Sequence, residues 1–170
     1  MNYDSPSTGS KEAQSMYFGN YGTTIGNTKS GTDETSYVGG KWNTQQCVSK
    51  ATNQDKTSDK VDNNPGEGYC APACCCVAYS TPGTKPGDWY LPSMEEIYQI
   101  YVNKTIINKK RDAIKASGFS EGNFYWSSIE HSSDYEYGVG LQGGSIDYYT
   151  KNNGLYVLGF LALEVSQLVN

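Results

Sequence analysis

The sequence predicts an α+β domain, and three observations support this prediction. Helical periodicity is confined to the middle of the chain, from about residue 71 to residue 117. Strand-like segments, bounded by Gly, Thr and Asn, lie on both sides of that region. Hydrophobic residues (36%) and charged residues (18%) are scarce, whereas there are 19 Gly and 15 Tyr. This composition favours short strands and long ordered loops over a helical bundle.

The N-terminal part is expected to hold an arm, a few short strands and a loop. Residues 1–15 are polar without periodicity, so we expect a flexible arm, followed by a single domain over residues 16–170. Short aromatic groups between Gly and Thr over residues 16–40 predict one or two short strands. Residues 50–68 are polar, which predicts an exposed loop.

Three helices are expected in the centre of the chain. The first covers residues 71–79, whose small apolar side chains can pack closely. The second begins at Ser93, because Ser93 and Glu96 have the spacing of a capping box, in which each side chain binds the backbone N–H of the other residue. The third covers residues 105–117 and ends at Gly118, a residue type that is common just beyond helix C-termini.

The C-terminal third predicts a hairpin and a central strand. Residues 135–141 alternate between large apolar side chains and polar or small ones, and the alternation resumes at Ile146. Between them, Gly143 and Gly144 predict a two-residue turn. Residues 155–163 form a nearly continuous apolar run, which predicts a last strand buried on both faces in the middle of the sheet.

The five cysteines admit three interpretations. Cys74, Cys75 and Cys76 fit small buried side chains on a helix, because free cysteine buries readily. A disulfide from Cys47 to a member of the cysteine cluster is a second possibility, and the odd count implies at least one free thiol or an intermolecular bridge. Zinc is the third, although adjacent cysteines do not converge easily on one tetrahedral ion.

Charge and hydropathy exclude two classes of partner. The net charge of −5 and pI near 4.8 argue against a nucleic-acid-binding surface, which would be basic. No apolar run reaches the length of a membrane-spanning helix, so we expect no membrane insertion. The first residues have neither a basic segment nor an apolar core, so we expect no signal peptide in this chain.

Three motifs resemble a known family. DWYLPS at residues 88–93, followed by Glu95 and Glu96, resembles the DWYLPS..EL signature of the DUF1566 family. YWSSIE at residues 125–130 resembles the YWSSTE motif of that family, and GGKWNT at residues 39–44 resembles its GtGkaNT segment. The motifs occur in the family's order, so the resemblance covers about residues 16–165. The family's terminal VRPVRAF strand has no counterpart with arginines here.

The resemblance implies a C-type-lectin-like fold and a non-enzymatic, receptor-like or adhesin-like binding function, displayed on a bacterial cell surface or a phage particle. Some members of the family resemble the variable proteins of diversity-generating retroelements, in which adenines of a C-terminal coding segment are mutated. The composition of residues 131–155 is similar to such a segment. The resemblance implies that the variable, ligand-binding positions are His131, Ser132, Asp134, Tyr135, Gly138, Gly140, Ser145, Asp147, Tyr148, Tyr149, Thr150, Asn152, Asn153, Gly154 and Leu155.

The remaining positions of this region are expected to form a fixed framework. We expect Trp126 to fill core space with its indole N–H satisfied, and the two serines after it to hold the chain in place. The full framework set is Trp126, Ser127, Ser128, Val139, Ile146, Lys151 and Val157.

The residue types alone also favour a binding surface. Five tyrosines crowd residues 135–156, interleaved with Ser, Asp and Asn. Tyr offers a large contact area with few rotatable bonds, and Ser and Asn offer adaptable hydrogen bonds. Alternation places Tyr137, Val139 and Leu141 inward and either Tyr148 or Tyr149 outward, since adjacent strand residues face opposite sides. The alternative is an ordinary amphipathic sheet whose polar side chains only face water.

No cofactor and no catalytic residue are expected. His131 is the only histidine and has no recognisable nucleophile motif near it, so we interpret it as a loop or contact residue. Glu130, Asp134 and Asp147 could supply part of a calcium site, but the motifs of calcium-dependent sugar binders are absent. The expected partner is a protein or a surface glycan. A fixed glycan-binding adhesin is the alternative function, and an enzyme on the same scaffold is a weaker one. The oligomeric state is not indicated.

Overall fold

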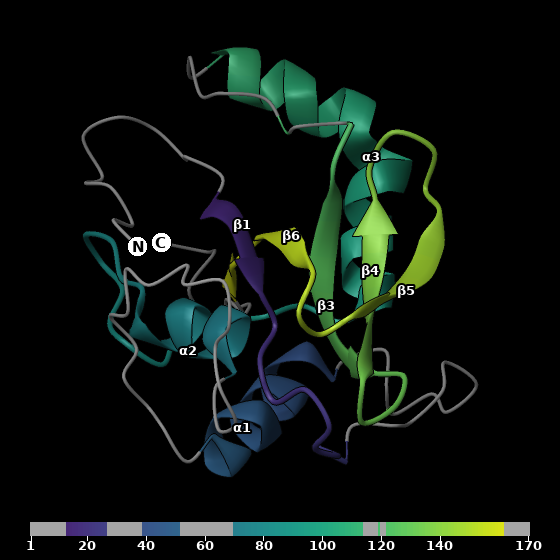
Figure 1. Ribbon diagram of the computed structural model, residues 1–170. Helices are drawn as coiled ribbons and strands as arrows, with labels where there is room; N and C mark the ends of the chain where they lie inside the picture. The colour runs from purple at the N-terminus through teal and green to yellow at the C-terminus, as the bar shows by residue number, and fades with distance from the viewer. Residues whose placement is uncertain (1–12, 27–38, 52–69, 114–118, 120–121, 162–170) are drawn as a thin grey trace.

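The computed structural model describes residues 13–26, 39–51, 70–113, 119 and 122–161 of the 170-residue chain. These residues form a mixed α+β structure, so the predicted α+β class is confirmed (Figure 1). The elements in chain order are β1 (Ala13–Tyr17), α1 (Gly40–Lys50), α2 (Ala71–Ala78), β2 (Trp89–Tyr90), α3 (Met94–Ala113), β3 (Phe124–Glu130), β4 (Tyr135–Gly140), β5 (Ile146–Thr150), β6 (Gly154–Val157) and β7 (Phe160–Leu161).

The main sheet has five strands in the order β1-β6-β3-β4-β5. All its neighbours are antiparallel except β3 and β6, which pair in parallel at Tyr125 and Tyr156. A second sheet consists of β2 and β7. The predicted last strand over residues 155–163 is therefore wrong as one unit, because the chain leaves the main sheet after Val157 and β7 pairs elsewhere. Its first part, β6, does lie inside the sheet, as expected.

Helices cover the two faces of the sheet, and a hydrophobic cluster fills the space on each side. On one face, the cysteines of α1 and α2 pack against Trp126 of β3 and against Leu155 and Val157 of β6. On the other face Tyr125 of β3 and Val139 of β4 pack against Ile97 and Ile100 of α3. Adjacent residues Tyr125 and Trp126 thus belong to opposite layers, as strand geometry requires.

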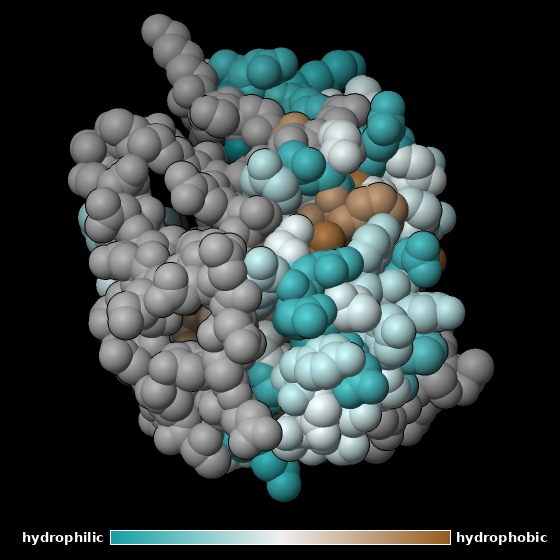
Figure 2. All heavy atoms as spheres, viewed as in Figure 1, coloured by the Kyte–Doolittle hydropathy of each residue, from teal (hydrophilic) through white to brown (hydrophobic). Residues whose placement is uncertain are grey.

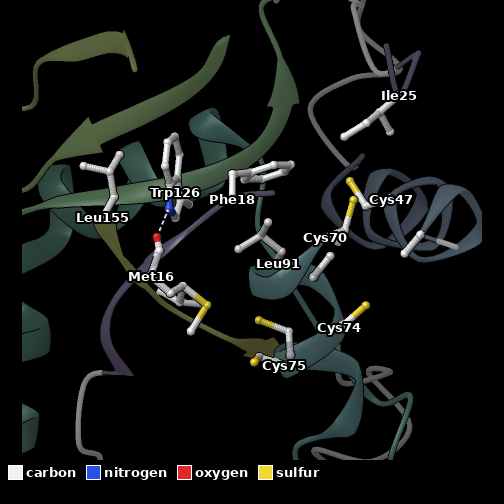
Figure 3. Packing of buried hydrophobic residues seen from close by; sticks show 14 residues of the cluster. Met16, Phe18, Ile25, Cys47, Cys70, Cys74, Cys75, Leu91, Trp126 and Leu155 are labelled. Carbon is white, nitrogen blue, oxygen red and sulfur yellow. Dashed lines mark hydrogen bonds between the residues drawn. The ribbon is translucent and has the colours of Figure 1, made fainter. Parts of the chain in front are cut away.

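Trp126 lies at the centre of the first layer. Its fully buried ring meets Phe18 edge-on at 5.5 Å between centroids. Its indole Nε1–H donates to the Met16 carbonyl at 2.7 Å, the dashed line in Figure 3. The prediction of a core tryptophan with a satisfied N–H is confirmed.

The helix predicted from residue 71 and the helix predicted from Ser93 both begin where expected. The second and third predicted helices, however, form one continuous helix, α3. α2 matches the expected helix at residues 71–79. The capping box is present: Ser93 N–H donates to Glu96 Oε2 at 2.8 Å, and Glu96 N–H donates to Ser93 Oγ at 3.3 Å. The helix expected over residues 105–117 is not separate, because α3 continues unbroken to Ala113. Gly118 lies outside the described residues.

The N-terminal predictions were less accurate. α1, which begins within the GGKWNT motif, was not expected, because its mixed polar sequence has no clear helical stripe. β1 begins at Ala13, inside the stretch expected to be an arm. Residues 1–12, most of the expected loop at residues 50–68, and residues 162–163 lie outside the described residues. Within the described part, no helix has the length and apolar character needed to cross a bilayer.

All five cysteines are buried, which agrees with the first of the three interpretations. Cys74, Cys75 and Cys76 line α2, and Figure 3 shows the Cys47 and Cys70 side chains directed toward each other from α1 and the start of α2. Their mutual hydrogen bond raises the pKa of Cys47, with burial adding to the effect, and lowers the pKa of Cys70. No group of three or more potential metal ligands occurs among the described residues.

Candidate functional site

Four aromatic side chains gather at the end of the hairpin, and we call them the aromatic patch: His131, Tyr135, Tyr137 and Tyr148. The His131 imidazole stacks on the Tyr148 ring with 4.2 Å between centroids and 15° between planes. It meets Tyr137 edge-on at 5.2 Å, and Tyr135 meets Tyr148 edge-on at 5.5 Å. His131 is exposed, and Tyr148 keeps 49% of its surface exposed.

Strand register explains why these rings meet. β4 and β5 pair without a shift from Tyr135 opposite Thr150 to Val139 opposite Ile146, and Tyr137 lies opposite Tyr148. Tyr135, Tyr137 and Val139 therefore share one face of β4. α3 covers that face around Val139, whereas Tyr135 and Tyr137 remain half-buried in the part nearer the β3–β4 turn. β5 is the edge strand of the sheet, so the patch opens at its border.

The prediction for Tyr137 was wrong in part. Tyr137 was expected inward with Val139 and Leu141, which are indeed buried, but Tyr137 is half-buried and belongs to the aromatic patch. Strand alternation alone cannot show where along a face a helix stops covering it. The expectation that Tyr148 and Tyr149 face opposite sides is confirmed. Tyr149 packs on Phe124 at 5.0 Å between centroids, and burial raises the pKa of its hydroxyl.

Two turns meet beside the aromatic patch and carry polar side chains. The Lys151 N–H donates to the Asp134 carbonyl at 2.9 Å, which joins the β5–β6 turn to the β3–β4 turn. Local bonds shape each turn: the Asp134 N–H donates to Ser132 Oγ at 3.3 Å, and the Thr150 hydroxyl donates to Asn153 Oδ1 at 2.9 Å. The turns thus hold Ser, Asp, Thr and Asn side chains next to the rings.

A buried ion pair lies beneath these turns. The Lys151 ammonium donates to Glu130 Oε1 at 2.6 Å, and both side chains are fully buried. It also donates to the Thr23 carbonyl at 3.0 Å. The Glu130 carboxylate accepts the N–H groups of Ile25 at 2.8 Å and Gly26 at 2.9 Å. One charged pair therefore fastens residues 23–26 to the end of β3 and to the β5–β6 turn.

The contacts of Glu130 also bear on the calcium site that the sequence left as an alternative. Glu130 was considered as a ligand together with Asp134 and Asp147. Its oxygens instead accept from Lys151 and from two backbone N–H groups. Asp147 Oδ1 accepts the Tyr148 N–H at 2.8 Å on the exposed edge strand. The residues proposed for calcium are thus not gathered around one point.

Glu136 is a second buried carboxyl group near the pair. It lies on β4 opposite Tyr149, and neither of its side-chain oxygens has a hydrogen-bond partner among the described residues. Burial raises its pKa well above the usual range, Lys151 opposes that shift, and Glu130 and Cys70 reinforce it. Its surroundings therefore favour the protonated, uncharged form of Glu136. This buried carboxyl group could not be predicted from the sequence, because its position in an alternating strand is equally typical of an exposed glutamate.

Most of the predicted ligand-binding residues lie at or near the surface. His131, Ser145, Asp147, Tyr148, Asn152, Asn153 and Gly154 are exposed, and Ser132, Asp134, Tyr135, Tyr149 and Thr150 are half-buried. The aromatic patch and the two polar turns bring together eight of these residues: His131, Ser132, Asp134, Tyr135, Tyr148, Thr150, Asn152 and Asn153. Asp147 and Tyr149 lie on the opposite side of β5 from Tyr148. Ser145 is apart from them, since it lies at the opposite end of the hairpin, where its carbonyl accepts the Gly140 N–H.

Three of the predicted positions lie in the interior instead. Gly138, Gly140 and Leu155 are buried. A Cβ on Gly138 would come within 2.8 Å of Leu155 Cδ1, and one on Gly140 would come within 2.9 Å of Ser145 Oγ. Larger side chains would disturb the packing at both glycines, so a role as freely varying contact residues is corrected for all three positions.

Most of the residues predicted as framework are buried. Ser127 and Ser128 are buried in β3, where Ser128 N–H donates to the Pro92 carbonyl at 2.8 Å and ties the strand to the start of α3. Val139, Val157 and Lys151 are buried as well. Ile146 is the exception, because it lies exposed on the edge strand.

The visible surface around the hairpin is mostly polar. Figure 2 shows hydrophilic colours over most of the described part of this face, with hydrophobic atoms confined to a few small areas. A partner that bound here would therefore meet rings, hydroxyls, amides and carboxylates more than aliphatic side chains.

In comparisons with known proteins, no family model matches the chain, and no curated protein matches it either.

Proposed function

We propose that the chain is a non-enzymatic binding domain that presents the aromatic patch and the two adjoining turns to a protein or surface-glycan ligand. The observation that carries this proposal is the clustering of four aromatic rings, two of them stacked, on an uncovered part of an edge-strand hairpin. Exposed aromatic rings beside Ser, Asn and Asp are the composition that adaptable binding surfaces use.

The scaffold under this surface supports the proposal. Binding costs conformational entropy when the contact residues must be ordered, and rigid surfaces lose less. Here the turns are joined by the Lys151–Asp134 backbone bond and fastened by the buried ion pair. The rings also hold one another in place. The side chains can therefore change while the backbone beneath them stays fixed.

A fixed backbone under changeable side chains fits the variable proteins of diversity-generating retroelements. Some members of the family that the three motifs resemble are similar to such proteins. The proposal is restricted to the exposed and half-buried members of the predicted set and leaves out Gly138, Gly140 and Leu155. It predicts a reverse transcriptase gene near the coding sequence and a template repeat that matches the codons of residues 125–157. Genomic DNA around the gene that lacks both would end the diversification part of the proposal.

A pair of display libraries tests the surface directly. Randomising His131, Ser132, Asp147, Tyr148 and Asn152 together should leave most clones folded, because these side chains lie outside the core layers. Panning that library against an unrelated soluble protein should then yield binders. A matched library at Gly138, Gly140 and Leu155 should lose display and protease resistance. If both libraries lose the fold equally, the surface is not separable from the scaffold and the proposal fails.

A fixed glycan-binding adhesin is the second candidate, and the buried positions favour it. Three residues that a diversified segment would vary cannot vary freely here. On a glycan array, a fixed adhesin would bind one reproducible class of sugar, and Tyr148→Ala would abolish that signal while the exposed control Lys41→Ala would not.

A further inference from the structure

α3 carries a second apolar stripe that faces away from the sheet. Its inner face holds Ile97 and Ile100, which pack in the core. On the outside, Tyr98, Val102 and Ile106 remain 37%, 57% and 62% exposed. Residues four apart on a helix lie on the same side, so these three form one row. A helix that is apolar on both sides is expected where a second partner covers the outer side.

Apolar residues lie at equal distances on both sides of Val102, and residues of opposite charge lie further out at equal distances. Tyr98 and Ile106 each lie four residues from Val102, while Glu95 and Lys109 each lie seven residues from it. Seven residues are close to two helical turns, so Glu95 and Lys109 continue the row at its two ends. Lys109 is exposed, whereas Glu95 is half-buried and its Oε2 is enclosed. The row therefore begins with a negative charge, has an apolar centre, and ends with a positive charge.

We propose that two copies of this chain associate through α3, with the helices antiparallel and crossing at Val102. In that arrangement the two Val102 side chains meet at the twofold axis, and Tyr98 of one copy faces Ile106 of the other. Glu95 of each copy faces Lys109 of its partner at both ends of the contact. A single self-complementary row of this kind is what an isologous dimer requires.

The charges at the two ends of the row favour a second copy of the chain as the partner and an antiparallel arrangement of the two helices. A parallel pairing would place Glu95 against Glu95 and Lys109 against Lys109, and like charges facing each other are strongly unfavourable at an interface. The contact spans about two heptads, or roughly 21 Å of helix. Its small apolar area predicts a weak, concentration-dependent dimer. The dimer does not depend on the aromatic patch, because no patch residue lies on α3.

Sedimentation equilibrium of the full chain tests the proposal. From about 1 µM to about 1 mM, a range that brackets the dissociation constants of small interfaces, the average mass should rise from 18.6 kDa toward twice that value. Val102→Glu should raise the dissociation constant at least about 10-fold, since it places two carboxylates at the twofold axis. Asn103→Glu adds the same charge at an exposed position beside the row and should have little effect.

Charge reversal then tests the direction of the helices. Glu95→Lys and Lys109→Glu should each weaken the dimer, and the double variant should restore it to within about 3-fold of the wild type, because the facing charges are again opposite. Thermal melts of each variant establish that it is folded. A mass that stays at 18.6 kDa throughout, association that Val102→Glu leaves unchanged, or a double variant that is not restored would each overturn the proposal.

Discussion

Lys151 shows how a single side chain can fix the geometry of a surface to which it contributes no exposed atoms. Lysine is almost never fully buried unless it is paired, and here its ammonium group is enclosed by Glu130 and the Thr23 carbonyl. Its backbone adds three more links, because the N–H donates to Asp134 and the carbonyl accepts from Phe18 and Gly19. The family resemblance implied that Lys151 is a framework residue, but nothing in the sequence identified Glu130 as its partner.

Removing one member of this pair should be costly. Lys151→Met leaves the Glu130 carboxylate buried without its counter-ion, so we expect a loss of about 3–5 kcal/mol in the free energy of unfolding, measured by urea denaturation. Lys50→Met, at an exposed lysine of α1, should change it by less than about 0.5 kcal/mol. A Lys151→Met variant as stable as this control would show that the pair does not form.

Glu136 should make stability depend on pH. The folded protein keeps the Glu136 proton because burial raises the pKa, whereas the unfolded chain releases it above about pH 4.3. The contribution of Glu136 to stability is therefore fully present below that pH and is lost as the pH rises toward the folded pKa, at up to about 1.4 kcal/mol per pH unit.

Glu136→Gln removes this ionisation while retaining a similar shape. Relative to the wild type, the variant should become more stable as the pH rises from about 4 to 8, with no gain at the acidic end, by urea denaturation at each pH. A gain that stays constant over this range would show that Glu136 does not change its protonation state on unfolding.

At the level of elements, local signals were reliable where one segment decides its own structure. The capping box at Ser93, the small-residue helix α2 and the alternation of β4 and β5 were all predicted correctly. The hairpin turn was only approximately right. The Gly140 N–H donates to the Ser145 carbonyl, so four residues form the loop, and Gly144 supplies the positive φ of 69°.

Elements that depend on distant partners were not predictable in the same way. The apolar run after Gly154 is divided between two sheets, because its second part, β7, pairs with β2. The periodicity of the run itself does not indicate with which strand it will pair. α1 has polar residues on most of its surface, so the helical pattern was weak even though Thr44 and Cys47 are buried. The Thr44 hydroxyl instead connects α1 to Leu91, accepting its N–H at 2.9 Å.

The strand β4 gives a direct test of which hairpin positions can vary. Gly138→Asn should destabilise the protein by about 1–3 kcal/mol, because its Cβ would meet Leu155 Cδ1 at 2.8 Å and the Tyr149 ring at 3.2 Å. Gly143→Asn should be nearly neutral, since no atom lies within 4 Å of a Cβ there. Urea denaturation of both variants decides the matter, and equal stability would contradict the packing around Gly138.

At the level of the whole molecule, the sequence predicted the α+β class and the hairpin that carries the candidate surface, but it assigned the Tyr137 side of that hairpin to the core. It did not predict how far α3 covers that side, and for this reason Tyr137 was placed in the core. It also could not separate the buried Gly138 and Gly140 from the exposed positions of the same hairpin. Small residues occur both where a surface is exposed and where two layers approach closely, and only the packing distinguishes these cases.

The burial of all five cysteines predicts a measurable property of the intact fold. A thiol reagent such as DTNB should label the native protein slowly, at a rate limited by opening of the fold. After denaturation it should react with five thiols per chain. A count of three in unreduced, denatured protein would instead reveal one disulfide. Rapid labelling of the native protein would contradict the closed layers around α1 and α2.

The position of β6 between β1 and β3 has a consequence for synthesis on the ribosome. β1 is made early but has no neighbour in the sheet until residues 154–157 have left the exit tunnel. β3 likewise waits for its parallel neighbour. The domain should therefore acquire its native structure only after nearly all of the described chain has been translated, and nascent intermediates would carry unpaired strand edges that favour chaperone binding.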